Sequence, residues 1–190
     1  MQGFGAVELA GVVFGLAYVW LAIRENVCCW PAGIANAALF LVVFFHARLY
    51  GAAALQLVYL ALSVYGWRQW LRGGEQQGRL AVSRTPLAWA IGLGVGASVV
   101  AVLLAIYLRQ RTADALPWSD AVTTAASLAA QWMTTRKWLE NWLVWIAVNA
   151  VYVAMYVSQR LHATAVLYAV FLVMAVLGYR EWRSSMRAAS

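Results

Sequence analysis

Aromatic, amide and hydroxyl side chains recur at helical spacing inside an apolar stretch near the end of this chain. Positions i, i+3, i+7, i+10 and i+14 of a helix share one face, and in residues 138–158 they hold Trp142, Trp145, Asn149, Tyr152 and Tyr156. Such rings can stack on a flat ligand or attract a ring-borne cation, at roughly 0.5–2 kcal/mol per contact. The amide and hydroxyl groups can hydrogen-bond a sugar or a heterocycle. The stripe therefore predicts a binding surface for a flat, polar, aromatic small molecule.

Three other apolar stretches carry stripes of the same kind. They are Asp120, Thr124, Ser127, Gln131 and Thr134 in residues 119–135; Gln56, Tyr59, Ser63 and Trp70 in residues 49–70; and Gly33, Asn36 and Phe40 in residues 27–45. Polar side chains are costly in a membrane and therefore face a bundle interior or a cavity. The predicted substrate-binding residues are Trp142, Trp145, Asn149, Gln131, Ser127, Gln56, Tyr59, Asn36 and Tyr152.

The other tryptophans have a simpler interpretation. Indole rings are enriched where a membrane meets water. We therefore assign to this aromatic belt Trp20, Trp67, Trp70, Trp89, Trp118, Trp138 and Trp182. Trp142 and Trp145 lie further inside their apolar stretch, and this position favours a binding role for both.

The sequence does not bring together the residues that catalysis or metal binding needs. Cys28 and Cys29 are adjacent, and His46 and His162 lie at the ends of apolar stretches, so neither a zinc site nor a deep haem ligand is indicated. Acidic residues do not occupy the central turns of these stretches, which favours passive over proton-coupled transport. We expect no catalytic residue, no metal site and no cofactor.

The composition places the stripes in a membrane. Hydrophobic residues make up 64% of the 190-residue chain and charged residues 11%, against roughly 45–50% and about 25% in globular proteins. Charged residues and prolines separate seven apolar runs, most of them close to the ~20 residues that a spanning helix needs: 4–23, 27–45, 49–70, 87–108, 119–135, 138–158 and 163–179. We predict an all-α integral membrane protein with seven transmembrane helices, in a single membrane domain over residues 1–190.

The basic residues predict the orientation of the chain. With seven spans, ten of the 14 basic residues lie on the side that holds the C-terminus, namely Arg24, Arg68, Arg72, Arg79, Arg84, Arg136, Lys137, Arg180, Arg183 and Arg187. Cytoplasmic loops carry an excess of basic residues. The C-terminus is therefore expected in the cytoplasm and the N-terminus outside. The net charge of +7 is then a topology signal, and we expect no nucleic-acid partner.

Polar landmarks recur in the same order in the two halves of the sequence. Glu25-Asn26, Trp30, Asn36 and residues 66–70 reappear as Glu140-Asn141, Trp145, Asn149 and residues 178–182. The offset falls from 115 to 112, which a deletion of three residues would explain. Residues 4–70 and 119–182 are thus predicted to form two three-helix repeats in parallel orientation, joined by a single helix over residues 87–108.

Two local features lead to further expectations. Gly92, Gly94 and Gly96 in the joining helix predict a close-packing surface. Glu140 follows Arg136 by four residues, a spacing that favours an ion pair on one helix face.

The segment Glu140–Asn149, with the pattern ENWxxWxxxN, resembles the signature of the PnuC family of vitamin transporters. The segment Tyr65–Trp70, together with Gln56, Asp120, Ser127 and Gln131, resembles other recurrent positions of that family. The resemblance extends from Val7 to Trp182. It implies a SWEET-like arrangement of 3+1+3 helices, usually in a homotrimer, in a bacterial inner membrane.

The resemblance also implies a function. Members of this family facilitate the diffusion of vitamins, best known for nicotinamide riboside, a precursor for NAD biosynthesis. A cytoplasmic kinase then drives uptake by phosphorylating the arriving substrate. By this resemblance Trp142 and Trp145 would pack on the heterocycle, while Asn149, Gln131 and Ser127 would hydrogen-bond the amide or the ribose. Relatives carry thiamine, riboflavin or deoxynucleosides, and these substrates stay open as alternatives.

A different class of function is also compatible with the stripes. The chain could be a non-transporting membrane subunit or a membrane enzyme, because polar contacts between helices are common glue in membranes. An enzyme would need a nucleophile, a base or a metal cluster near the midplane, and the sequence offers none there. A subunit would have stripes that satisfy one another without a central cavity.

Overall fold

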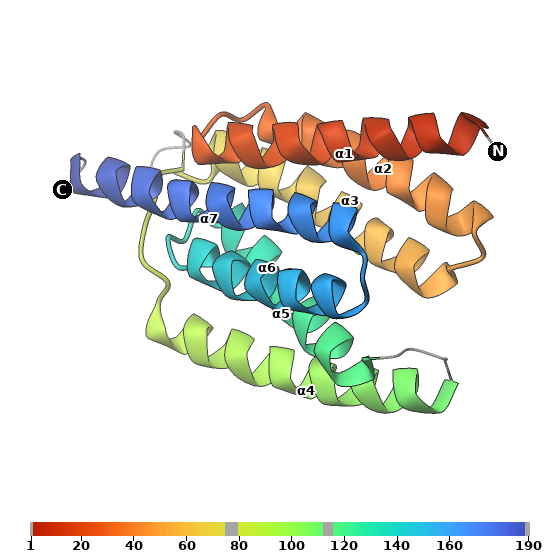
Figure 1. The fold of residues 1–190 in the computed structure, drawn as a ribbon. Helices are drawn as coiled ribbons and strands as arrows, with labels where there is room; N and C mark the ends of the chain where they lie inside the picture. Colours follow the sequence, from red (N-terminus) through yellow and green to blue (C-terminus); the bar gives the residue numbers. More distant parts are fainter. Residues whose placement is uncertain (1, 75–79, 112–115, 189–190) are drawn as a thin grey trace.

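The residues that the structure describes form seven α-helices, as the apolar runs predicted. The computed structural model describes residues 2–74, 80–111 and 116–188; Arg79, used above for orientation, lies outside them. The helices are α1 (Gln2–Ile23), α2 (Cys29–His46), α3 (Tyr50–Arg72), α4 (Leu87–Arg111), α5 (Pro117–Thr135), α6 (Asn141–Ser158) and α7 (His162–Ala188). They lie side by side along one direction, with α4 at one edge and the two termini at opposite ends (Figure 1). The all-α fold class is confirmed.

Within the described ranges, five helices are long and apolar enough to cross a membrane by themselves: α1, α2, α4, α6 and α7. The remaining two, α3 and α5, have a more polar composition. In α5 the polar side chains of Thr123, Ser127, Gln131 and Thr134 are buried. Helix α5 thus has a lower hydropathy because it presents a polar face to the bundle interior, as expected for membrane proteins.

The two three-helix units α1–α3 and α5–α7 share one constant register. Helices α2 and α6 both contain 18 residues and begin 112 positions apart, at residues 29 and 141; α3 and α7 begin at residues 50 and 162, the same distance apart. The left-handed turns repeat as well, with φ of 52° at Glu25 and Lys137, and 60° and 59° at Arg48 and Arg160. The equivalent of Glu25 is therefore Lys137, and the offset of 115 inferred from the sequence is wrong.

Close contacts between tryptophan and glycine repeat at the same interval. A Cβ atom on Gly66 would overlap the indole of Trp30, and one on Gly178 would lie 2.6 Å from Cε2 of Trp142. In each unit an indole of the second helix thus packs directly on the backbone of the third. The equivalent of Trp30 is Trp142, and the pairing of Trp30 with Trp145 is corrected accordingly.

The units meet through α1 against α7 and α3 against α5, while α4 packs on α5. The glycines of α4 do not pack closely within the chain, because a Cβ atom on Gly92, Gly94 or Gly96 would have nothing within 4 Å. Within the described part of this chain, no helix packs closely on the predicted surface of α4, and that surface stays a prediction.

A row of four buried tryptophans crosses from one unit to the other. Ring centroids are 5.3 Å apart between Trp30 and Trp70, 5.8 Å between Trp70 and Trp182, and 5.3 Å between Trp182 and Trp142. Trp70, Trp182 and Trp138 are at most 7% exposed. Their assignment to the aromatic belt is therefore wrong, because these indoles lie inside the bundle.

This row lies at one end of the bundle, which we call the basic end. The end is defined by the α1–α2 turn (residues 24–28), the α5–α6 turn (residues 136–140) and the described linker residues 80–86, together with the end of α3. The turns and linker contribute Arg24, Arg84, Arg136 and Lys137. With Arg72 in the last turn of α3, five of the ten basic residues used above to predict orientation thus lie here.

The packing of Trp142 on Gly178 leads to a stability prediction. Gly178→Ala should lower the free energy of unfolding by about 1–3 kcal/mol, because the added methyl group forces a rigid buried indole to move. Gly94→Ala is the matched control, since its methyl group meets open space and favours the helix. Thermal unfolding in detergent measures both, and equal melting temperatures for the two variants would contradict the proposed contact.

Candidate functional site

Polar side chains from both units meet in the interior of the bundle. The hydroxyl of Tyr18 on α1 donates a hydrogen bond of 3.1 Å to Oε1 of Gln131 on α5. Tyr18 also lies against Gly33 of α2, where a Cβ atom would be 2.9 Å from its ring. Gln131 is only 4% exposed. One predicted site residue is thus oriented by a tyrosine of the other unit.

Ser127, one turn before Gln131 on α5, is the second meeting point. Tyr59 of α3 and Tyr152 of α6 both lie close enough to its side chain for their hydroxyl groups to interact with it. Tyr152 also contacts Thr123, one further turn along α5. Three predicted site residues, Ser127, Tyr59 and Tyr152, are therefore brought together by the fold.

Tyrosine rings continue this arrangement along α6 and α7. The centroid of Tyr168 lies 4.7 Å from that of Tyr152 and 5.2 Å from that of Tyr156. We call Tyr18, Tyr59, Tyr152 and Tyr168, with Ser127 and Gln131, the tyrosine layer. Its members come from α1, α3, α5, α6 and α7.

The other predicted amides are not joined to this layer by the hydrogen bonds of the described residues. Asn149 is 6% exposed, and its Nδ2 donates to the carbonyl of Trp145 one turn earlier at 2.8 Å. Asn36 donates from Nδ2 to the carbonyl of Gly11 at 2.7 Å, which ties α2 to α1. Gln56 is half-buried on α3, three residues before Tyr59.

The two tryptophans of the ENWxxWxxxN segment have different surroundings. Trp142 is 3% exposed and packs on Gly178 and Trp182, as its equivalent Trp30 packs on Gly66. Trp145 is only partly buried against the same core. This packing favours a structural role for Trp142, and Trp145 stays the candidate for stacking on a ligand.

Sequence reasoning missed Tyr18 and Tyr168. A signal for Tyr18 was present, because Gly11, Gly15 and Tyr18 are spaced by four and three residues and so share a helix face. That face packs on α2, where Cβ atoms on Gly11 and Gly15 would lie 2.9 Å from Phe40 and 3.0 Å from Asn36. Tyr168 had no comparable signal, since only the fold shows that α7 lies beside α6.

The side chains of the tyrosine layer are of the types that bind a neutral or cationic ring compound. Phenol, amide and alcohol groups both donate and accept hydrogen bonds, which suits a carboxamide or sugar hydroxyls. Aromatic faces attract a ring that carries positive charge. Among the described residues no cluster of three His, Cys, Asp or Glu side chains could hold a metal ion. The layer therefore supports binding of an organic ligand.

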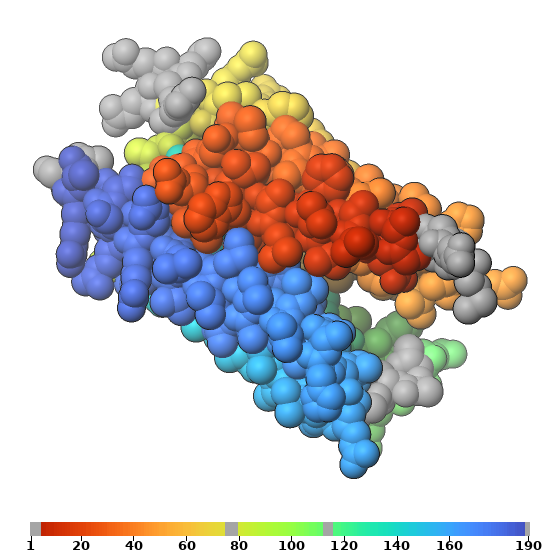
Figure 2. All heavy atoms as spheres, turned by 45° about the horizontal axis from the view of Figure 1, so that its top comes forward, coloured from red at the N-terminus to blue at the C-terminus, as the bar shows by residue number. Residues whose placement is uncertain are grey.

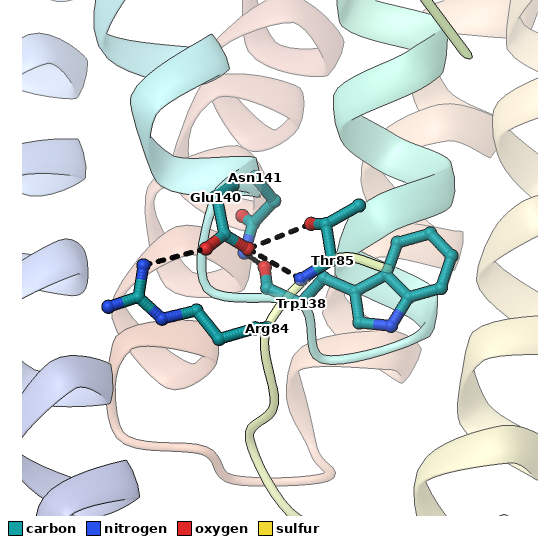
Figure 3. A network of polar contacts seen from close by, with 5 residues as sticks. All are labelled: Arg84, Thr85, Trp138, Glu140 and Asn141. Carbon is teal, nitrogen blue, oxygen red and sulfur yellow. Dashed lines mark hydrogen bonds and ion pairs between the residues drawn. The ribbon is translucent and has the colours of Figure 1, made fainter. Parts of the chain in front are cut away.

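The start of the ENWxxWxxxN segment has a structural role at the basic end. The Glu140 carboxylate accepts hydrogen bonds from Arg84 at 3.2 Å and from the backbone and hydroxyl of Thr85, each at 2.8 Å (Figure 3). The predicted ion pair with Arg136 is wrong, because the Arg136 guanidinium lies over the Trp132 ring, 5.4 Å from its centroid.

The neighbouring residues complete this contact. Ser83 donates from its backbone to Lys137, and Leu139 donates back to the carbonyl of Ser83. Asn141, fully buried, donates from Nδ2 to the carbonyl of Trp138 at 2.6 Å. We call the contact of residues 83–85 with residues 137–140 the linker clasp. It fixes the α5–α6 turn against the segment before α4.

The linker clasp predicts a pH dependence of stability. Burial raises the pKa of the Glu140 carboxyl, but hydrogen bonds from Thr85 and Arg84 outweigh it and hold this pKa below its ordinary value of 4.5. A carboxyl with a lowered folded-state pKa stabilises the fold above its unfolded pKa, and this contribution disappears as the pH falls through the folded pKa.

Between about pH 5 and about pH 3 the melting temperature of the unaltered protein should therefore fall more than that of Glu140→Gln. Glu181→Gln, at an exposed position of α7, serves as the control and should behave like the unaltered protein. Parallel pH profiles for all three proteins would show that the clasp makes no such contribution.

Comparison with known proteins agrees with this architecture. Residues 5–184 match the family described as nicotinamide mononucleotide transporters. The chain is 28% identical to the nicotinamide riboside transporter PnuC of Escherichia coli K12, over 95% of this chain and 86% of the relative. It is 27% identical to the riboflavin/roseoflavin transporter RibM of Streptomyces davaonensis, over 92% and 83%. A crystal structure of the vitamin B3 transporter PnuC superposes with a TM-score of 0.75 at 21% identity, covering 97% of this chain and 83% of that one.

Proposed function

This chain belongs to the nicotinamide mononucleotide transporter family, and we propose that it imports nicotinamide riboside across the bacterial inner membrane by facilitated diffusion. It is a multi-pass membrane protein, with five helices that qualify as spans by length and hydropathy. The PnuC relative carries the name of this substrate. We propose a transporter and not an enzyme.

The observation that carries the proposal is the tyrosine layer, which both units build together. Tyr18 belongs to the first unit and its partner Gln131 to the second, so a ligand bound there touches both. A site at the interface of parallel repeats becomes accessible from either side when the repeats rock against each other. Facilitated diffusion requires a binding site that can be reached from each side of the membrane in turn.

The chemistry of the layer fits nicotinamide riboside. Its pyridinium ring is cationic, and tyrosine and tryptophan faces attract such a ring without a carboxylate. Gln131 and Ser127 offer hydrogen bonds to the carboxamide and the ribose. A cytoplasmic kinase, without contact to this chain, would trap the vitamin by adding a phosphate whose charge the layer does not neutralise.

The orientation and the oligomer belong to the same proposal. The gathering of basic residues at one end supports a cytoplasmic C-terminus and an N-terminus in the periplasm. A homotrimer is supported by the resemblance stated above. The open glycine face of α4 is compatible with a neighbouring copy.

Riboflavin is the second candidate substrate, because the RibM relative covers nearly the whole chain at similar identity. Its flat ring system and ribityl hydroxyls would use the same groups of the layer. Thiamine, another cationic ring compound, is a third. The substrate is therefore tested against all three.

Counterflow in proteoliposomes tests the function. Vesicles that contain the protein and unlabelled nicotinamide riboside should accumulate the labelled compound, and Gln131→Leu should weaken its apparent affinity about tenfold or more, because a buried hydrogen-bond partner is lost. Gln110→Leu, at an exposed position of α4, is the matched control. Counterflow of riboflavin or thiamine without that of nicotinamide riboside would overturn the choice of substrate.

A tryptophan pair tests the stacking surface. Trp145→Ala should weaken binding of nicotinamide riboside by about 1.5 kcal/mol, roughly tenfold in Kd, through loss of a ring contact. Trp67→Ala removes an exposed indole of α3 and should leave Kd unchanged. Calorimetry on the purified protein measures both values, and unchanged affinity in a folded Trp145→Ala variant would remove this residue from the site.

A further inference from the structure

One ion pair joins the two units at the basic end. Nζ of Lys137 donates to Oε2 of Glu25 at 2.8 Å, with the two side chains only 7% and 22% exposed. Nζ of Lys137 also lies 4.6 Å from the ring centroid of Trp70. Glu25 and Lys137 are equivalent positions of the two units, both at φ 52°. The ion pair therefore links equivalent positions of the two three-helix units.

Two indole hydrogen bonds cross between the units beside this pair. Nε1 of Trp182 donates to the carbonyl of Ala22 at 2.9 Å, and Nε1 of Trp70 donates to the carbonyl of Thr134 at 3.0 Å. The donors are 112 positions apart, and so are the acceptors. The two indole bonds therefore occupy equivalent positions of the two units, and each unit makes the same contact with the other.

The same carbonyls hold the turns that carry the charges. The backbone N–H of Glu25 donates to Ala22 at 3.0 Å, and that of Lys137 donates to Thr134 at 3.1 Å. Each carbonyl therefore binds its own turn and the indole of the other unit. Separation of the units here would break the ion pair and both indole bonds together.

The opposite end of the bundle has a different surface. Figure 2 shows a hollow there, between the α2–α3 region in orange and the beginning of α7 in blue. The basic end is filled instead by the core of buried indoles, which also contains Ile23, Cys29 and Leu139. The structure is thus closed at the basic end and hollowed at the other.

We propose that the ion pair of Glu25 and Lys137, together with the Trp70 and Trp182 indole bonds, forms the gate that closes the basic end during transport. The proposal rests on the transport function stated above. It assigns Glu25, Lys137, Trp70 and Trp182 as positioning residues that hold the two units in the closed arrangement. None of the four belongs to the tyrosine layer.

A partly buried ion pair suits a contact that must open repeatedly. The attraction between the two charges is largely offset by the cost of removing both from water. The paired state and the state with two separate hydrated charges therefore have similar free energies. Loss of one partner differs, because it leaves a buried charge without compensation. The intact ion pair therefore favours the closed geometry, and the two charges can still separate when water hydrates both of them.

Cys29 offers a built-in reporter of this opening. The chain has two cysteines; Cys28 is exposed, whereas Cys29 is buried in the core at the basic end. Cys29 lies close enough to Lys137 for its thiol to interact electrostatically with the ammonium group. In a full-length Cys28→Ser background, the rate of maleimide labelling at Cys29 thus measures access of water and reagent through the gate.

The labelling rate in the Cys28→Ser background should be low. Glu25→Gln should raise it about tenfold or more, because a charge-assisted hydrogen bond is lost. The reversed pair Glu25→Lys with Lys137→Glu should restore the slow rate. Arg84→Gln is the matched control, since it breaks the other ion pair of this end, which does not join the units.

A second pair of variants separates opening from a direct effect of charge on the thiol. Trp182→Phe removes the N–H that bonds Ala22 without a change of charge, and it should also speed labelling. Trp132→Phe makes the same change of volume at an indole outside this core, whose Nε1 also has no hydrogen-bond partner among the described residues, and it should not. Size-exclusion chromatography confirms that each variant is folded.

Acceleration by Glu25→Gln alone, with Trp182→Phe still slow, would overturn the gate, because charge next to the thiol would then explain the result. Equal acceleration by Arg84→Gln or Trp132→Phe would overturn it as well, since general loosening would be the cause. The labelling assay contains no vitamin, so its failure leaves the transport proposal standing. If labelling behaves as expected but counterflow fails, the transport proposal is contradicted and the contact at the basic end stands.

Discussion

The packing of indole rings on bare backbone is the contact on which the rest of this structure depends. Lipid gives no hydrophobic drive for helices to associate, so close van der Waals contact and interhelical hydrogen bonds must hold a membrane bundle together. Trp30 and Trp142 supply the first kind by packing on Gly66 and Gly178. Each unit then presents a tryptophan of its third helix to the other, which adds a cross-unit hydrogen bond to the packing.

This arrangement explains why polar groups can occupy the interior further along the bundle. Because buried aromatic packing fixes the units at the basic end, the hydroxyl and amide groups of the tyrosine layer need not hold the helices together by themselves. Their hydrogen bonds, such as that from Tyr18 to Gln131, can then be exchanged for bonds to a ligand. A membrane site must satisfy its polar groups in the empty state too, and the bond between Tyr18 and Gln131 does so for this pair.

The sequence was sufficient to predict the helices, because charges and prolines at their ends are local signals. It also indicated Ser127, Gln131, Tyr59 and Tyr152, which the fold does bring together; whether they bind substrate stays a prediction. Register was harder, since matching the letters of Glu25-Asn26 and Glu140-Asn141 gave an offset of 115, whereas geometry pairs Glu25 with Lys137. A glutamate and a lysine at equivalent positions look unrelated when the two halves are aligned. In the fold these two positions lie next to each other, and their opposite charges attract. The partner of Glu140 was equally hidden, because Arg84 lies 56 positions away.

The tyrosine layer and the basic end lie one helical turn apart along α1 and α5. Tyr18 precedes Ala22 by four residues, and Gln131 precedes Thr134 by three, so each of these two layer residues lies one turn from a carbonyl that binds an indole of the other unit. A ligand bound as proposed would replace the bond between Tyr18 and Gln131, which joins α1 to α5. The same two helices carry, in their last turns, the carbonyls that accept both indole bonds. In the proposed mechanism, binding and opening therefore act on one pair of helices, as a carrier whose site faces one side at a time requires.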